Sequence, residues 1–193
     1  FTENELRNGW DGVTNTAWTD VAFDNSQMQK HNVSFTNGSE NGNYYLSLTY
    51  LDNNGIVKGD VDVYKRLTAT VNSEYAIKPW LKVGTTNQIE KFNIRSVSMN
   101  NEYGSLLTSI LQLDPLTPDT YAADKLPAHM QTALNNGKHL LKNENGDYYA
   151  VPKYYAGEQF HPMIMRDNNI GKNSGFNVNG SIYSDFKPIK DFT

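Results

Sequence analysis

The 193-residue chain contains no cysteine, so it has no disulfide, no Cys-ligated zinc and no thiol nucleophile. It contains no run of 18 or more apolar residues, which excludes a transmembrane helix but leaves open a membrane barrel of short, half-apolar strands. Charge of one sign is also lacking: 17 Lys and Arg against 21 Asp and Glu are interspersed, and nothing predicts a nucleic-acid groove. The chain begins at Phe1, without Met or signal peptide, as expected of a processed product or a piece of a larger protein.

Catalytic motifs are missing as well. The sequence has no G-x-S-x-G, P-loop or H-E-x-x-H pattern, so we expect no enzyme and no cofactor. His129 and His139 lie ten residues apart without an acidic ligand at a regular offset, which favours solvated histidines over a metal site. The fragments "DNNG" (52–55) and "NENGD" (143–147) lack the ligand series of a calcium loop, and we interpret both as turns.

What the chain does contain is aromatic residues and alternation. Aromatics make up 12% of the residues, Tyr alone occurs 12 times, and Asn and Gly are frequent, which is typical of all-β proteins. Five segments, around 31–36, 43–51, 66–75, 81–90 and 176–183, set an apolar row against a polar row with period two. We predict five antiparallel strands there, and the start of a sixth near Asp191.

The connections between these strands alternate between short and long. "GSENG", "AIKPW" and "DFKPIK" are short, whereas "DNNGIVKGDVDV" is longer and the link from about 93 to 174 is very long. An up-and-down membrane barrel has short turns at one rim and long loops at the other. The apolar rows could equally form the dry core of a soluble β-sandwich, and alternation alone does not decide between lipid and core.

The barrel interpretation assigns residues to rims. If the short turns are periplasmic, Tyr44, Tyr75, Trp80 and Leu81 lie at that interface, and Tyr50, Lys65 and Lys91 lie towards the outside. No charge falls in the middle of an apolar row, where it would cost about 2–4 kcal/mol in lipid. Asn87 is the one awkward residue, a polar amide on a row assigned to lipid.

An ordered series of motifs carries a resemblance across essentially the whole chain. "NTAWTDVAF" (15–23) precedes a His-Asn-x-Ser strand, a Gly-rich turn, a Tyr-rich strand, "GIVKG", "YKR" and "WLKVG", all within 29–88. "LQLDPLTPDTY" (111–121) and "GFNVNGSIYSDFKPIKDFT" follow. In this order the motifs resemble the SusC/RagA family of TonB-dependent outer-membrane transporters of Bacteroidetes.

The resemblance implies that residues 1–193 are part of the receptor's β-barrel domain, an all-β segment of five or six strands, with 93–174 as a long extracellular loop. No plug domain or TonB box is recognised in it. The family imports oligosaccharides, or sometimes peptides, across the Gram-negative outer membrane with TonB and a SusD-like surface lipoprotein as partners. The polar rows would then face the lumen; they include Arg66, Thr68, Asn72, Glu74, Lys82, Gln88 and Glu90. The alternative is a soluble all-β domain that binds glycans or acts as an adhesin.

The long connection holds the remaining candidates. "YGSLLTSILQL" (103–113) and "DKLPAHMQTALNNGKHLL" (124–141) are predicted to form short helices, the second ending at Gly137. An aromatic cluster follows, made of Tyr148, Tyr149, Tyr154, Tyr155 and Phe160. Such rings could stack on a sugar, but packing within the loop or against a partner is the favoured interpretation.

Overall fold

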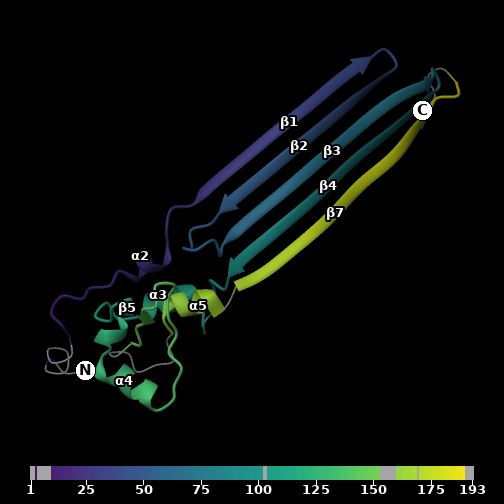
Figure 1. Cartoon of the computed structure of the whole chain (residues 1–193). Helices are drawn as coiled ribbons and strands as arrows, with labels where there is room; N and C mark the ends of the chain where they lie inside the picture. Colours follow the sequence, from purple (N-terminus) through teal and green to yellow (C-terminus); the bar gives the residue numbers. More distant parts are fainter. Residues whose placement is uncertain (1–2, 4–9, 102–103, 153–159, 169, 190–193) are drawn as a thin grey trace. The chain divides into compact units, whose positions relative to one another are not determined.

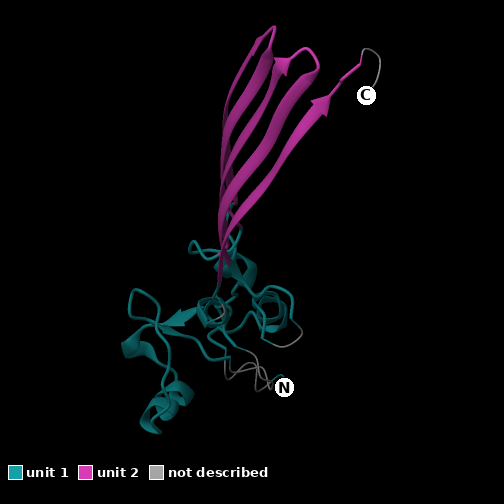
Figure 2. Cartoon of the chain, turned by 90° about the vertical axis from the view of Figure 1, so that its right-hand side faces the viewer, with its two compact units in different colours: residues 1–25, 56–61, 96–171 teal, residues 26–55, 62–95, 172–193 magenta. Residues whose placement is uncertain are grey.

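The computed structural model describes residue 3 and residues 10–101, 104–152, 160–168 and 170–189. The chain divides into two compact units, coloured separately in Figure 2. We call residues 26–55, 62–95 and 172–193 the sheet unit, and residues 1–25, 56–61 and 96–171 the loop unit.

The sheet unit is a single antiparallel layer of five long strands, shown side by side in Figure 1. Their order is β1-β2-β3-β4-β7, and each strand lies next to its neighbour in sequence. The bounds are β1 Gln27–Ser39, β2 Gly42–Asn54, β3 Val63–Lys78, β4 Leu81–Val97 and β7 Ile170–Phe186. All five predicted strands are confirmed, and all are longer than predicted because their polar ends continue to pair with the adjacent strand.

The connections follow the predicted alternation of short and long. β1 and β2 are joined at residues 40–41, and β3 and β4 at residues 79–80, so one end of the sheet is its hairpin end. At the opposite end, the loop end, residues 55–62 and 98–169 leave the sheet. The long connection is therefore shorter than the predicted 93–174, because β4 and β7 extend into it. The predicted sixth strand near Asp191 lies outside the described residues.

The predicted turn at "DNNG" is wrong, because β2 runs through Asp52 to Asn54. The chain reverses later, at Gly59 (φ +94°) and Asp60 (φ 51°). Asp52 keeps an extended conformation because it pairs with Lys65 of β3, with which it forms an ion pair of 3.2 Å. Cross-strand pairing has thus overridden the local turn propensity of these residues.

The loop unit combines short elements with irregular chain. It contains α2 Trp18–Ala22, α3 Leu106–Gln112, β5 Thr120–Tyr121, the 3-10 helix η1 Ala123–Lys125, α4 Ala128–Asn135, β6 Tyr148–Tyr149 and α5 Pro162–Asn168. The helices predicted in 103–113 and 124–141 are confirmed as α3 and α4, and Gly137 follows α4 with φ +75°. Nothing in the sequence pattern had predicted α2, α5 or the small β5–β6 sheet. None of the helices in the described ranges is long and apolar enough to cross a membrane.

The two units differ in where their apolar side chains lie. Every buried apolar residue of the described chain belongs to the loop unit, around Trp18, Leu106, Met130 and Met163. In the sheet unit most of the large apolar residues are exposed and the rest are half-buried, whereas the buried side chains are polar, Ser47 and Thr68. A β-sandwich needs a second layer over its apolar rows, and the described sheet unit is one layer.

Candidate functional site

The strand register sorts the side chains of the sheet onto two faces. Directly paired residues share a face, so Phe35, Leu46 and Val71 of three successive strands lie on one side. We call this the apolar face; its large exposed members are Val33, Phe35, Tyr44, Leu46, Leu48, Tyr50, Leu67, Val71, Tyr75, Ile77, Ile89, Phe176, Val178, Ile182 and Phe186. Their exposed fractions run from 39% to 88%, so the described residues leave a large part of each of these side chains uncovered.

The apolar face has the dimensions and edges of a membrane-spanning surface. Along β3, ten residue steps separate Lys65 near the loop end from Tyr75 near the hairpin end. Ten steps of about 3.3 Å, tilted by about 40°, give a height of about 25 Å, which is the thickness of the apolar band of an outer-membrane barrel. Tyr44 and Tyr75 lie at the hairpin end, where Trp80 also packs edge-on against Phe186 with ring centroids 5.5 Å apart.

Asn87, the awkward polar residue of the apolar face, is satisfied locally. It is paired with Val71, and its Nδ2 donates a hydrogen bond of 2.7 Å to Thr85 Oγ1 on the same strand. Its amide also lies against Gly180, where a Cβ would collide with Asn87 Oδ1. The absent side chain of Gly180 therefore makes room for the amide, and the sequence could not have shown this pairing.

The opposite side, the polar face, brings together the residues predicted to line a lumen. Arg66, Asn72, Glu74, Lys82, Gln88 and Glu90 all occupy this face by register. Charged pairs tie neighbouring strands: Arg66 Nη1 lies 3.6 Å from Glu90, and Lys82 Nζ lies 3.3 Å from Glu74. Glu74 also accepts a hydrogen bond from the Tyr183 hydroxyl, whose ring lies over Gly84. The face is therefore a hydrogen-bonded, water-compatible surface; its orientation to a lumen stays a prediction.

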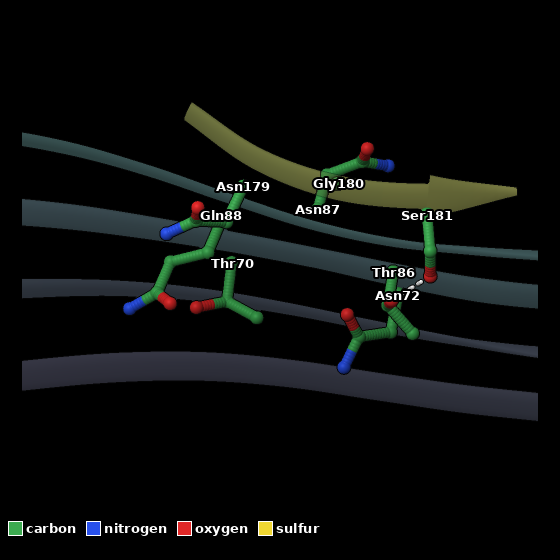
Figure 3. A pocket seen from close by; sticks show the side chains of 8 residues that line it. All are labelled: Thr70, Asn72, Thr86, Asn87, Gln88, Asn179, Gly180 and Ser181. Carbon is green, nitrogen blue, oxygen red and sulfur yellow. Dashed lines mark hydrogen bonds between the residues drawn. The ribbon is translucent and has the colours of Figure 1, made fainter. Parts of the chain in front are cut away.

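Between these charged pairs lies an uncharged groove of about 400 Å³. Its side chains are amides and hydroxyls, and Figure 3 shows the hydrogen bond of 2.7 Å between the Thr86 and Ser181 hydroxyls. The lining residues are Thr70, Asn72, Thr86, Asn87, Gln88, Asn179, Gly180 and Ser181. The Asn87 side chain points away from those of Thr70 and Asn72 in this view, in keeping with its place on the apolar face.

The predicted aromatic cluster of the loop unit is not one surface. Tyr149 is 8% exposed and belongs to the core, and burial raises the pKa of its hydroxyl. Tyr148 is half-buried beneath Lys142, whose Nζ lies 4.4 Å from the ring centroid. Phe160 is 53% exposed. Tyr154 and Tyr155 lie outside the described residues. Packing within the loop unit, the favoured interpretation, therefore holds for Tyr149.

Sequence reasoning missed the residue that joins the loop unit together, His161. It is 2% exposed and lies between two aromatic rings, with centroid distances of 5.3 Å to Trp18 and 4.8 Å to Tyr149. Its Nδ1 accepts the Met163 N–H at 3.2 Å, and its Nε2 lies 2.9 Å from the Asp119 carbonyl oxygen. These partners are far apart in sequence, and no local pattern predicts their meeting.

The other candidate ligand groups do not form a metal site. In the part of the chain that the structure describes, no group of three or more His, Asp or Glu side chains could hold a metal ion. His129 instead lies 3.3 Å from the Val151 carbonyl oxygen. The predicted turn at "NENGD" is confirmed: Asn143 Oδ1 accepts the N–H groups of Asn145 and Asp147 at 2.9 and 3.0 Å.

A cleft of about 600 Å³ opens beside Tyr149 in the loop unit. Its charged lining includes Asp119, Glu144, Lys142, Arg166 and Asp167. The arginine is already engaged: Arg166 Nη1 donates to the Lys58 carbonyl at 2.9 Å and Nε to Asp167 at 2.6 Å. The guanidinium therefore stabilises the loop unit through these hydrogen bonds, and it is not a candidate for binding an anion.

Comparison with known proteins supports the resemblance seen in the sequence. No family model matches the chain. The chain is 36% identical over 112 residues to the TonB-dependent receptor SusC of Bacteroides thetaiotaomicron, which covers 55% of this chain and 10% of that receptor. It also superposes on a chain of the RagAB peptide importer, solved in its closed-closed state, with a TM-score of 0.57 and 22% identity. This match covers 97% of the chain and 20% of the solved one.

The chain thus spans about a tenth of the curated relative and a fifth of the solved structure. The structural likeness confirms the expected fold, an antiparallel all-β piece of a barrel wall that does not close on itself. Neither relative is described as an enzyme, in agreement with the prediction from the missing catalytic motifs. On the sequence and structural likenesses together, the chain is SusC/RagA-like: it resembles a part of a TonB-dependent outer-membrane receptor.

Proposed function

We propose that this chain forms part of the barrel wall of an active importer in the outer membrane, driven through TonB, that takes up glycans or peptides. The apolar face contacts lipid, and the polar face, with Arg66, Asn72, Glu74, Lys82, Gln88 and Glu90, lines the lumen. The chain contributes transport and no bond chemistry. The two relatives support this proposal: one is described as a TonB-dependent receptor and the other as a peptide importer.

One observation carries the proposal: apolar and polar side chains of the sheet unit are distributed in the opposite way to those of a water-soluble domain. Most of its large apolar side chains are exposed, none of those described is buried, and its buried side chains are polar. Burial of apolar area stabilises a fold in water by about 25 cal/mol per Å², and the described residues leave much of the apolar area of this face unburied. The hydrocarbon core of a membrane supplies an apolar environment for this face, and the height of the face, about 25 Å, matches the apolar band of an outer-membrane barrel. A soluble glycan-binding domain would need a covering layer that the described sheet unit does not have.

We propose further that the loop unit lies on the extracellular side and contacts a SusD-like lipoprotein. The long connection of residues 98–169 leaves the sheet at the loop end, and it shares a core with residues 18–22 and 57–61 of the loop unit. An internally packed unit can present a defined surface, whereas a structureless link of that length could not. Phe160, exposed beside the core residue His161, is the aromatic side chain best suited to anchor such a partner.

The membrane placement is tested by extracting the native polypeptide that contains this chain, with and without detergent, and by measuring its intact mass. We expect a protein much larger than 21.8 kDa that requires detergent and fractionates with the outer membrane. Uptake of labelled oligosaccharides or peptides should stop when TonB is removed. A water-soluble monomer near 21.8 kDa would contradict the proposal.

The partner contact predicts the outcome of a Phe160→Ala variant. Loss of an exposed interface aromatic costs about 1 kcal/mol or more, so we expect at least about fivefold weaker binding of the co-purified lipoprotein. Substrate affinity of the receptor alone should stay unchanged, because the favoured role of the ring is partner contact. The two affinities are measured separately on the intact receptor, by pull-down titration and by calorimetry. Weaker substrate affinity with normal partner binding would instead assign Phe160 to the ligand.

A further inference from the structure

Most charged side chains on the apolar face lie near one end of it. Among the described strand residues of this face, Lys78, which pairs with Leu81, lies at the hairpin end. The other five Asp, Glu, Lys and Arg side chains are Asp52, Lys65, Lys91, Arg95 and Lys172, all near the loop end. Four of the five are cations. The polar face differs, because it carries both signs at both ends, as in the pairs Arg66–Glu90 and Lys82–Glu74.

Three of the cations are neighbours on β3 and β4. Lys65 pairs directly with Asn93, and Lys91 and Arg95 lie two residues to either side of Asn93 on the same face. Diagonal neighbours of this kind are about 7–8 Å apart in an antiparallel sheet. All three side chains are exposed, so their long stems can bring the charged groups together over one ligand.

The fourth cation comes from β7. Asn177 Nδ2 donates a hydrogen bond of 3.2 Å to Glu90 Oε1, which fixes the register of β7 against β4. Five residues further towards the loop end on each antiparallel strand, Lys172 comes opposite Arg95. Like Arg95, it is exposed. Among the described strand residues near this end of the apolar face, one carboxylate, Asp52, pairs with Lys65 at 3.2 Å, so these five side chains carry a formal net charge of +3.

We propose that Lys65, Lys91, Arg95 and Lys172 form a binding site for the phosphate of an anionic lipid headgroup in the outer leaflet. The inference rests on the proposed function, which places this face against lipid. Ammonium groups bind phosphate as point charges, and a guanidinium binds two of its oxygens at once. Basic clusters at the edge of a hydrocarbon-facing surface are complementary to anionic headgroups in this way.

The position of the cluster selects a lipid rather than a dissolved anion. Lys91 pairs with Leu67, which is exposed on the same face, so the apolar row begins at the cluster itself. A lipid can lay its acyl chains over this row while its phosphate reaches the cations. A free phosphate makes only the contact with the cations, and on an open surface it competes with water for that contact.

The test uses the intact receptor that contains this chain, solubilised in a neutral detergent and titrated with lipid under native mass spectrometry. The probes are phosphatidylglycerol, phosphatidylcholine with the same acyl chains, and inorganic phosphate. The triple variant Lys91→Gln, Arg95→Gln, Lys172→Gln should bind phosphatidylglycerol at least about tenfold more weakly, since each basic residue near a membrane surface contributes several-fold. Its binding of phosphatidylcholine should not change.

A matched control removes the same charge elsewhere. Lys30, Lys138 and Lys187 are exposed and lie off the apolar face, so their triple replacement by Gln should leave phosphatidylglycerol binding within about twofold of the parent. The variant Asp52→Asn removes the carboxylate beside Lys65 and should strengthen the binding of phosphatidylglycerol. If both triple variants lose affinity equally, net charge explains the binding and the site is refuted.

Two further outcomes separate the hypotheses. If inorganic phosphate displaces phosphatidylglycerol at equal concentration, the site takes a soluble anion, and the lipid assignment is overturned. A receptor that needs detergent and binds both lipids equally contradicts this inference alone. A receptor that needs no detergent and binds neither lipid contradicts the proposed function itself.

Discussion

Replacing Val71 with arginine is expected to lower the free energy of unfolding in a bilayer by about 2–4 kcal/mol. Val71 lies on the apolar face of β3, six residues from Lys65 and four from Tyr75, and therefore near the middle of the apolar band. A guanidinium there must leave water for hydrocarbon, or draw water and headgroups inward. The measurement is a reversible urea titration of the intact receptor in phospholipid vesicles, with the folded fraction read from its heat-modifiable gel mobility.

Thr70→Arg is the matched control for this variant. Thr70 is the preceding residue of the same strand and lines the uncharged groove on the polar face. Its replacement adds the same charge at the same height, into a water-compatible environment, so we expect a change below about 1 kcal/mol. Equal losses in the two variants, or a larger loss at Thr70, would show that the apolar face does not contact lipid.

The sheet was predictable because a pleated strand imposes period two on its own sequence. Leu46 and Leu48 alternate with Ser47 and Thr49, and this alternation is the same whether the apolar row contacts lipid or a protein core. Where the strands end was not predictable, because the apolar row does not continue into the ends and their conformation depends on a partner. In β4, for example, Ile89 is followed on the same face by Lys91, Asn93 and Arg95. Asp52 shows this: the residues around it are typical of a turn, and its pairing with Lys65 of the adjacent strand β3 keeps it extended.

Sequence reasoning also identified the polar face but not the contacts within it. Alternation places Glu74, Lys82 and Gln88 on one side once β3 and β4 pair, and the register follows from their short hairpin. The fit of Gly84 beneath Tyr183 depends on β7, which arrives after a long connection. No pattern within either strand contains that information, since the two residues are 99 positions apart.

The loop unit was the least predictable part, because its core is assembled from distant segments. α3 and α4 carry helical patterns of their own and were found. His161 instead takes its role from Trp18, Tyr149 and Asp119, which approach from three other segments. A histidine in an irregular stretch gives no sign of whether such neighbours will gather around it.

Trp18→Ala is therefore expected to unfold the loop unit selectively, at a cost of about 3–5 kcal/mol. Trp18 is 5% exposed, its Nε1 donates to the Asp114 carbonyl at 2.8 Å, and its ring meets that of His161 nearly at right angles. The variant loses packing, a hydrogen bond and the aromatic contact together. Hydrogen exchange of the intact receptor measures the effect, as lost amide protection within residues 96–171 while the sheet strands stay protected.

Trp10→Ala separates this mechanism from the simple loss of an indole. Trp10 also donates its Nε1 hydrogen to a carbonyl, that of Thr14 at 2.7 Å, but it is 39% exposed and its partner is only four residues away. Its replacement should cost less than about 1 kcal/mol and leave exchange unchanged outside its own segment. The two variants remove the same side chain and a similar hydrogen bond, so only burial and the distance of the partners in sequence distinguish them. If both leave residues 96–171 equally protected, the packing of Trp18 against His161 does not hold the loop unit together.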